Sequence, residues 1–386
     1  MIGLTEANWG GQPMSDTAEI DLAAVRFPRQ TVSLLQTSGM TVEAFRYSTG
    51  VKAIRIVTPA GTVVVLPFKG QQVWDATFRG RRLTMTSIFD EPQATTDYLS
   101  TYGAFLLHCG IAAIGAPGAG DNHPLHGELP NALFQSARLI AGTDDIGPFL
   151  KLVGSSRQRR SFAHNYLFCS EITLRPEATH LDVSVAAENL SEIPLDVMYL
   201  AHINFRPVDN GRLIDTVLDD RTDIEVRRHL LPGLAYSAEF LSMNEALCAD
   251  PAVHRQLLSR RRIDPEVVLF LKCQPDSDGW AHGLQVHPDG NADFVSYKPA
   301  ELPIAVRWLS RTGDLEALGL ILPSTSGVDG YTAEKAKERV KTIARRDRFT
   351  CSYRCGALDP VAAQLMVCSV DRVISHARSV QNIGGH

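Results

Sequence analysis

The sequence lacks the long apolar runs and the cysteine pattern that mark membrane-spanning and disulfide-stabilised proteins. No stretch of about 18 uninterrupted apolar residues occurs, which is the length a membrane-spanning helix requires. The first 22 residues have no basic start followed by an apolar run, so we expect no leader segment there. The seven cysteines are odd in number and scattered, which favours reduced thiols. These absences predict a cytoplasmic protein with no membrane partner.

The sequence also lacks an excess of positive charge. It has 38 basic and 43 acidic residues and a net charge of −5, so we expect no nucleic-acid partner. The basic clusters at 157–160 and 260–262 are short and suit a solvated surface. No low-complexity linker or repeat divides the chain. We therefore expect a single domain over residues 1–386, with 1–30 as an N-terminal extension or first strands, and leave a homodimer open.

Apolar residues recur with a period near two in much of the chain. The segments 51–68, 71–88 and 180–205 alternate or are rich in β-branched and aromatic residues, and turn sequences such as PAG and FRG interrupt them. Helical patterns are limited to 250–262, which opens with Asp250 and Pro251, and 332–346. The sequence predicts an all-β fold, a large antiparallel β-sandwich with a few helical insertions.

Two histidines and a glutamate stand close together in DNHPLHGELPNA, residues 121–132. Prolines and a glycine exclude a regular helix there, so His123, His126 and Glu128 belong to a loop. Loops on rigid β scaffolds often carry function, and this one concentrates groups that titrate or bind metal ions. Pro124 holds His123 extended, so its side chain need not point where His126 points.

A second polar pair lies on a predicted strand, in MYLAHINFRP (198–207). Alternation places His202 and Asn204 on one face, beside Met198 and Leu200. Polar groups on an otherwise apolar strand need partners if they are buried, or a ligand that supplies them. A core pair that bonds a loop backbone and a ligand-binding pair both remain open.

Four segments, in this order, resemble motifs of one known family. They are KGQQVWDATFRGRRLTM (69–85), HCGIAAIGAPGAGDNHPLHGELPNA (108–132), MYLAHINFRP (198–207) and, more weakly, LEALGLILPSTSGVDGY (315–331). In these motifs the chain resembles the aldose 1-epimerases, or galactose mutarotase-like proteins, and most closely an uncharacterised branch of them. The resemblance implies a galactose mutarotase-like supersandwich. It also implies a carbohydrate-active isomerase that interconverts the anomers of a small sugar without a cofactor.

The resemblance also assigns site residues. His126, followed by Gly127, resembles the family's substrate-binding histidine, and His202 resembles its proton donor, with Asn204 beside it. Further substrate-binding candidates are Trp74, Asp75, Arg81 and, from the segment YKPAELP, Lys298.

The chain departs from the family where the general base is expected. Related sequences have a glutamate directly before a proline, whereas this chain has Leu322 before Pro323. Opening a pyranose ring requires a base for the anomeric hydroxyl and an acid for the ring oxygen. Because Leu322 cannot accept a proton, we expect Glu128, which shares a motif with His126, to act as the base. Asp75 and Asp329 are weaker candidates.

The same residues allow two other functions. His123, His126, Glu128 and His202 are the ligand types of a divalent metal site, which would suit a metal-dependent sugar isomerase or carbon epimerase. A non-catalytic protein could instead bind a sugar with Trp74, Arg81 and His126. The mutarotase hypothesis predicts no bound metal.

Overall fold

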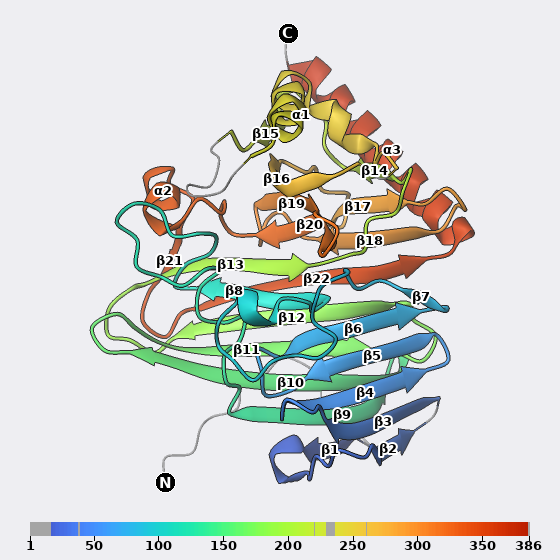
Figure 1. Cartoon of the computed structure of the whole chain (residues 1–386), viewed down its shortest axis with the longest axis vertical. Coiled ribbons are helices and arrows are strands. Elements are labelled where there is room, and N and C mark those ends of the chain that lie inside the picture. Colours follow the sequence, from blue (N-terminus) through green and yellow to red (C-terminus); the bar gives the residue numbers. More distant parts are fainter. Residues whose placement is uncertain (1–16, 38, 220, 229–235, 260, 385–386) are drawn as a thin grey trace.

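A computed structural model of the chain describes residues 17–37, 39–219, 221–228, 236–259 and 261–384. Its strands form two large antiparallel sheets (Figure 1). This architecture confirms the predicted all-β sandwich with few helices. The start of the predicted N-terminal extension, residues 1–16, lies outside the described residues.

The first sheet has nine strands. In spatial order they are β1 (Ala18–Asp21), β9 (Ser136–Asp144), β10 (Gly147–Arg160), β11 (His164–Leu174), β12 (His180–Asn189), β22 (Arg348–Leu358), β18 (Ala292–Tyr297), β17 (Ala281–Val286) and β14 (Arg212–Asp215).

The second sheet has thirteen strands, and β7 (Arg81–Arg82) and β21 (Lys341–Ile343) pair at the side with β6 and β13. Its main path is β15 (Ile224–Val226), β16 (Ile263–Leu271), β19 (Ile304–Arg311), β20 (Glu316–Ser324), β13 (Leu195–Ile203), β8 (Leu106–Ile111), β6 (Gln72–Phe78), β5 (Gly61–Leu66), β4 (Lys52–Thr58), β3 (Met40–Arg46) and β2 (Val32–Thr37).

The hydrophobic core lies between the two sheets. Along β12, Leu181, Val183 and Val185 are buried while the residues between them are partly exposed, as the period of two requires. They join one cluster with residues of the other sheet, such as Ile54 of β4 and Leu200 of β13. The strands predicted over 51–68, 71–88 and 180–205 are therefore confirmed.

The helices are few, and their positions differ from the expectation. They are the 3-10 helices η1 (Leu22–Ala24), η2 (Leu99–Thr101) and η3 (Pro251–Arg255), and the α-helices α1 (Ala238–Ala249), α2 (Tyr331–Ala336) and α3 (Pro360–Gly384). Asp250 caps η3, accepting from the Ala252 N–H at 3.2 Å, but the helix predicted over 250–262 ends at Arg255, so that prediction is wrong. The helix predicted over 332–346 likewise ends at Ala336.

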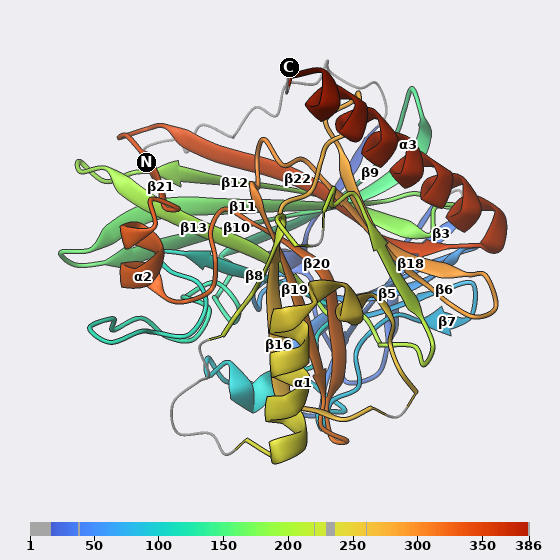
Figure 2. The same ribbon diagram turned by 90° about the horizontal axis from the view of Figure 1, so that it is seen from above.

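The long helix α3 was not predicted. It lies along the outside of β17 and β18 (Figures 1 and 2), where Ala363 and Val370 are buried in a cluster with Phe294. Its start carries a recognisable cap, because the Asp359 carboxylate accepts from the Ala362 N–H at 2.9 Å and Pro360 follows at the first position. None of the described helices is long and apolar enough to cross a membrane.

Candidate functional site

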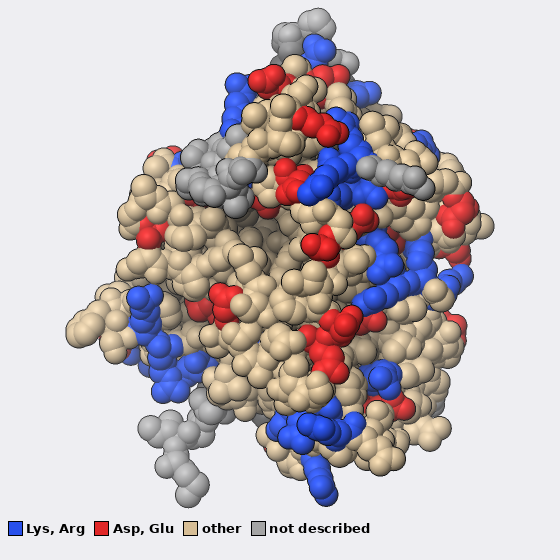
Figure 3. Space-filling model, in the orientation of Figure 1, with Lys and Arg blue, Asp and Glu red and all other residues tan. Residues whose placement is uncertain are grey.

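One cavity brings together the two histidines that the sequence singled out. It lies on the face of the thirteen-stranded sheet where β16, β19, β20 and β13 are neighbours, and its volume is about 310 Å³. The face seen in Figure 3 is hollowed near its centre, where these strands lie in Figure 1. Its lining comprises Tyr98, Leu99, Tyr102, Gly115, Ala116, Leu125, His126, Leu200, His202, Arg227, Pro265, Glu266, Val268, Val306, Trp308, Leu322 and Val328.

His202 is held in one orientation by Asn204. Its Nδ1 lies 2.8 Å from Asn204 Oδ1, which confirms that the two residues share a face of the chain. The Asn204 amide donates to the Ala104 carbonyl at 2.9 Å, and Tyr102 donates to Asn204 Oδ1 at 3.1 Å. Oδ1 is thus the acceptor, so Nδ1 of His202 carries the proton. In the neutral ring the cavity-side Nε2 is therefore unprotonated.

His126 reaches the cavity from a tightly tied loop. Its backbone N–H donates to the Gly115 carbonyl and its carbonyl accepts from the Gly110 N–H, both at 3.0 Å. His126 itself has φ 60°, and at Gly127 (φ 78°) a Cβ would lie 2.3 Å from the Ala113 oxygen, so only glycine fits there. Nδ1 of His126 is buried without a hydrogen-bond partner among the described residues.

Aromatic rings surround the two imidazoles. The ring centroids of His126 and His202 are 5.1 Å apart, with the rings nearly perpendicular. Tyr98 lies 5.0 Å from His126, and Tyr102 and Trp308 lie 5.9 and 5.4 Å from His202. Planar apolar faces beside a few polar groups are typical of small-molecule sites, and they suit the C–H faces of a sugar ring.

A carboxylate that the sequence analysis missed completes the cavity. Glu266, at the start of the apolar run of β16, accepts from the Trp308 indole N–H at 2.6 Å and from the Arg227 guanidinium. Its side chain is 22% exposed, so it is accessible to a ligand. A glutamate inside IDPEVVLFL is unusual for an apolar strand, and this pattern could have identified it.

Leu322, which precedes Pro323 where the resemblance implies a base, lies at the cavity. It is 1% exposed, lines the cavity and pairs with Val306 in the β19–β20 ladder. The position of the expected base therefore faces the site but carries no acceptor. On one side of β20 the sheet continues with β19 and then with β16, the strand that carries Glu266.

Burial controls the protonation of both histidines. It lowers the pKa of His202 to about 3 and that of His126 to about 4, because the surroundings solvate the cation poorly. His126 also lowers the pKa of His202, whereas the hydrogen bond to Asn204 and the charge of Glu266 raise it. The charges of His123 and Arg227 further lower the pKa of His126. Both imidazoles are thus neutral near pH 7 in the ligand-free protein.

Glu128 does not line this cavity. Its Oε1 accepts from the backbone N–H groups of Ile111 and Ala112, at 3.1 and 3.0 Å, and from the Tyr166 hydroxyl. These contacts tie the 121–132 loop to the end of β8. The carboxylate that the sequence suggested as a base is therefore engaged in holding the loop.

The side chains expected for a metal site are not brought together. His123 bonds the Pro124 carbonyl at 2.8 Å and lies 3.6 Å from Asp121, and it does not line the cavity of His126 and His202. Within the described ranges no group of three or more His, Cys, Asp or Glu side chains could hold a metal ion. The expected set of His123, His126, Glu128 and His202 is incorrect as a ligand cluster.

Four further sequence candidates lie outside the cavity lining. Trp74 is 5% exposed and packs in an apolar cluster with Tyr98 and Tyr102, so it supports the aromatic wall. Asp75 pairs with Arg82 at 2.7 Å. Arg81 pairs with Asp293 at 3.1 Å, and Lys298 with Glu301 at 3.5 Å.

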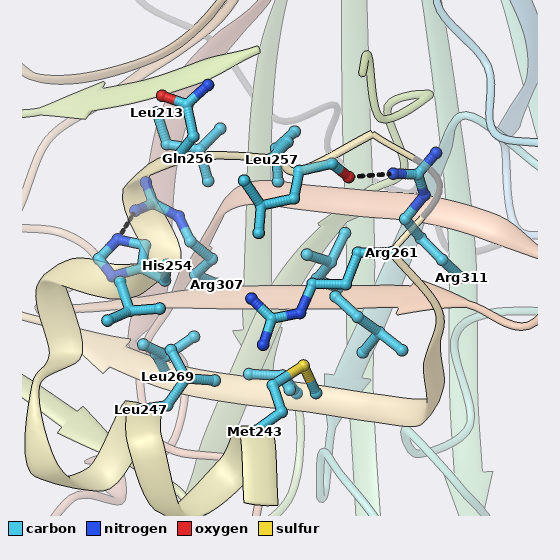
Figure 4. A pocket seen from close by; sticks show the side chains of 15 residues that line it. Leu213, Met243, Leu247, His254, Gln256, Leu257, Arg261, Leu269, Arg307 and Arg311 are labelled. Atoms are coloured by element: carbon cyan, nitrogen blue, oxygen red, sulfur yellow. Dashed lines mark hydrogen bonds between the residues drawn. The ribbon is translucent and has the colours of Figure 1, made fainter. Parts of the chain in front are cut away.

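A second, smaller pocket lies between α1 and the strands β16 and β19 (Figure 4). The buried Arg307 beside it contacts Asp215 at 2.9 Å and His254 at 2.5 Å. Its volume is about 40 Å³, which suffices for a few water molecules but not for a sugar ring. The ion pair supports the packing under α1, and the cavity of His202 remains the candidate site.

Comparison with known proteins supports the fold. A crystal structure of a candidate aldose 1-epimerase from Klebsiella pneumoniae superposes with a TM-score of 0.78 at 14% identity, covering 93% of this chain and 96% of that one. A galactose mutarotase-like protein from Clostridium acetobutylicum gives a TM-score of 0.55 at 14% identity, over 82% and 97% of the two chains. A candidate aldose 1-epimerase from Escherichia coli gives 0.52 at 14% identity, over 83% and 99%.

The chain therefore has the galactose mutarotase-like fold that the sequence motifs implied. A sequence family described as a domain of unknown function, DUF4432, matches residues 48–222, which hold His126 and His202. No curated protein sequence matches the chain.

Proposed function

We propose that this protein is an aldose 1-epimerase-like enzyme that interconverts the anomers of a sugar by acid and base catalysis. The observation that carries the proposal is the presence of His202 and Glu266 in one cavity, beside Leu322 at the usual position of the base. An imidazole and a carboxylate are the two groups that ring opening requires.

The reaction is a balanced exchange of protons. Glu266 takes the proton of the anomeric hydroxyl, the C1–O1 bond becomes a carbonyl, and the bond between C1 and the ring oxygen breaks. The electron pair stays on the ring oxygen, which receives a proton from the His202 imidazolium at Nε2. The open aldehyde rotates, and the same steps in reverse close the ring on its other face.

The contacts of Glu266 suit the role of base. It lines the cavity with 22% of its side chain exposed, and Arg227 and Trp308 both donate to it. They also fix its orientation, with one partner on each oxygen. Glu128 is not the base in this proposal because it does not line the cavity of His202.

A further polar group of the cavity, on His126, suits recognition. His126 Nδ1 is buried without a partner, and a sugar hydroxyl would satisfy it. Tyr98, Tyr102 and Trp308 present ring faces to the C–H groups of the sugar. The ligand is thus a monosaccharide ring held by few hydrogen bonds and much apolar contact.

One observation favours a non-catalytic sugar-binding protein as the second candidate. Burial lowers the pKa of His202 to about 3, so the acid form is scarce near pH 7 unless a ligand changes its surroundings. A protein that only binds would need no imidazolium.

Exchange spectroscopy distinguishes the two functions. We would measure the NMR exchange rate between the α and β anomers of hexoses, pentoses and uronic acids, with and without the protein. An enzyme accelerates exchange of at least one sugar in proportion to its concentration. Saturable binding with exchange at the rate of buffer alone contradicts catalysis and supports the binding function.

A further inference from the structure

One oxygen of Glu128 joins the loop of His126 to both sheets. This Oε1 accepts from the backbone N–H groups of Ile111 and Ala112, at 3.1 and 3.0 Å, and also from the Tyr166 hydroxyl. Ile111 ends β8 of the thirteen-stranded sheet, whereas Tyr166 lies in β11 of the nine-stranded sheet. Because Glu128 follows His126 by two residues, the junction lies next to the part of the loop that enters the cavity.

Three other hydrogen bonds tie this segment to Gly110, near the end of β8. The His126 carbonyl accepts from the Gly110 N–H at 3.0 Å, and the N–H groups of Glu128 and Leu129 donate to the Gly110 carbonyl at 3.1 and 3.0 Å. Among the hydrogen bonds that residues 126–129 make within the described chain, that of Tyr166 is the one that reaches the nine-stranded sheet. Contacts along the end of one strand leave the segment free to tilt about that strand, and a contact from the opposite sheet restrains this tilt.

Burial keeps the Tyr166 hydroxyl protonated. Tyr166 is 0% exposed and belongs to the hydrophobic core together with Leu129 and Ile111. Burial raises the pKa of Tyr166 well above its usual value, and the charge of Glu128 raises this pKa further. The hydroxyl is therefore a donor near pH 7, and Glu128 is the acceptor that it reaches.

The turn between Glu128 and His126 leaves little room for independent movement. His126 has φ 60° and Gly127 has φ 78°, and Gly127 packs so closely that a Cβ there would lie 2.3 Å from the Ala113 oxygen. A displacement of Glu128 is therefore passed on to His126. The His126 ring centroid lies 5.1 Å from that of His202, so the displacement changes the geometry of the pair that faces the sugar.

We propose that Tyr166 is a positioning residue for the reaction. Its hydroxyl acts through Glu128 and sets the place of His126 in the cavity, although Tyr166 itself does not line the cavity. This inference rests on the proposed function, in which His126 binds a sugar hydroxyl. It assigns to the nine-stranded sheet a part in substrate binding on the far face of the other sheet.

The test compares two substitutions of tyrosine by phenylalanine. Tyr166→Phe removes the hydroxyl that Glu128 accepts from and keeps the ring. The matched control is Tyr353→Phe, because Tyr353 is 1% exposed, lies in the same core and has its hydroxyl 3.1 Å from that of Tyr199 in β13. Each variant loses one buried hydroxyl, so urea unfolding should show losses of stability of similar size.

Kinetics separate a positioning role from a loss of stability. KM and kcat would be measured by NMR anomer exchange with glucose, galactose, xylose and glucuronic acid. We expect Tyr166→Phe to raise KM by about tenfold with kcat changed by less than about twofold, since a binding contact is weakened in the ground state and the transition state alike. Tyr353→Phe should change neither constant by more than about twofold. Equal kinetic changes in the two variants, or an unchanged KM in Tyr166→Phe, would overturn the assignment.

A double-mutant cycle identifies the residue through which Tyr166 acts. His126→Ala should raise KM by itself, and adding Tyr166→Phe to it should raise KM by less than about twofold more, because the group that Tyr166 positions is already absent. Fold-changes in KM that multiply in the double variant would show that Tyr166 acts by a route other than His126.

A measurement without sugar keeps this inference separate from the proposed function. If no sugar is turned over or bound, the proposed function fails, but the NMR signals of the His126 imidazole, assigned by their absence in His126→Ala, still report its surroundings. These signals should shift in Tyr166→Phe and stay in place in Tyr353→Phe. Unshifted His126 signals in Tyr166→Phe would contradict the positioning role whatever the sugar.

Discussion

Nδ1 of His202 lies 2.8 Å from Oδ1 of Asn204, whose amide group is itself fixed by the Ala104 carbonyl. This contact determines which ring nitrogen faces the cavity, because an amide oxygen only accepts. Any proton that His202 exchanges with a ligand therefore passes through Nε2. The predictions that concern catalysis depend on this geometry.

Replacing His202 by asparagine removes the proposed acid while it keeps a polar side chain of moderate size. We expect His202→Asn to lower the rate of anomer exchange by ~10²-fold or more and to leave the Kd for the sugar within a few-fold. The rate is measured by NMR exchange and the Kd by calorimetry. An unchanged rate would remove His202 from the mechanism.

Glu266 and Glu128 can be distinguished by matched substitutions to glutamine. Glu266→Gln keeps the size of the side chain but cannot accept the anomeric proton, so we expect a loss of ~10²- to 10⁴-fold in kcat. Glu128→Gln should instead weaken the loop, lowering the free energy of unfolding by ~1–3 kcal/mol, because the contacts of Oε1 with three donors are disturbed.

Kinetics and urea unfolding of both variants provide the measurement. A large loss of kcat in Glu128→Gln, with full activity in Glu266→Gln, would return the role of base to the loop carboxylate that the sequence suggested.

Leu322 offers a gain-of-function test. Its side chain lines the cavity, and the resemblance implies a glutamate at this place in the sequence, so Leu322→Glu puts a carboxylate there. In the Glu266→Gln background we expect Leu322→Glu to restore part of the lost kcat, by ~10-fold or more. Leu322→Gln in the same background is the control. Equal rates with glutamate and glutamine at 322 would show that no base acts from this position.

The fold was predictable because its determinants are local and repeated. The period of two in 51–68 and 180–205 identifies half-buried strands wherever they pair, and adjacent His202 and Asn204 follow from alternation alone. The helix over 250–262 failed for a different reason. After Arg255 the chain leaves the helix because Gln256 forms a β-bridge with Arg212, and Leu257 exchanges backbone hydrogen bonds with Asn210 and Gly211. This pairing outweighs the local helical preference.

The site was predictable only where a motif carried it. His126 and His202 stood in recognisable segments. Glu266 lies at the cavity because β16, β19 and β20 are neighbours in the sheet, and the periodicity of a single sequence does not encode this order. The prediction that Glu128 shares the site with His126 is wrong, because proximity in sequence does not determine on which side of the loop a side chain lies. In the tight turn at His126 and Gly127, the two side chains leave on opposite sides of the loop.

Buried histidines outside and inside the site predict how stability depends on pH. Burial lowers the pKa of His108, His202 and His254 to about 3 and that of His126 to about 4, below the value of ~6.5 in an unfolded chain. Between these values the unfolded state binds more protons, so stability is full above pH ~6.5 and falls as the pH decreases toward 3. Each histidine then contributes a loss of about 1.4 kcal/mol per pH unit.

Urea unfolding between about pH 7 and about pH 5.5 measures this slope. His108→Gln, which removes an imidazole that does not line the cavity of His202, should reduce the slope by about one quarter if the four histidines contribute equally. A slope that is the same in the variant would show that His108 does not titrate on unfolding.

The pH dependence of the rate tests the acid itself. Burial lowers the pKa of His202 to about 3, so the imidazolium fraction near pH 7 is small and rises ~10-fold for each unit of decrease in pH. We therefore expect kcat, corrected for exchange in buffer, to increase from about pH 7 to about pH 5.5, with a slope of about −1 in log kcat against pH. The lower limit of this pH range is set by the loss of stability at acid pH. In His202→Asn the residual rate should show no such slope. A wild-type kcat that is flat or that rises with pH would mean that neutral His202 accepts a proton at Nε2, and the roles of His202 and Glu266 would then be exchanged.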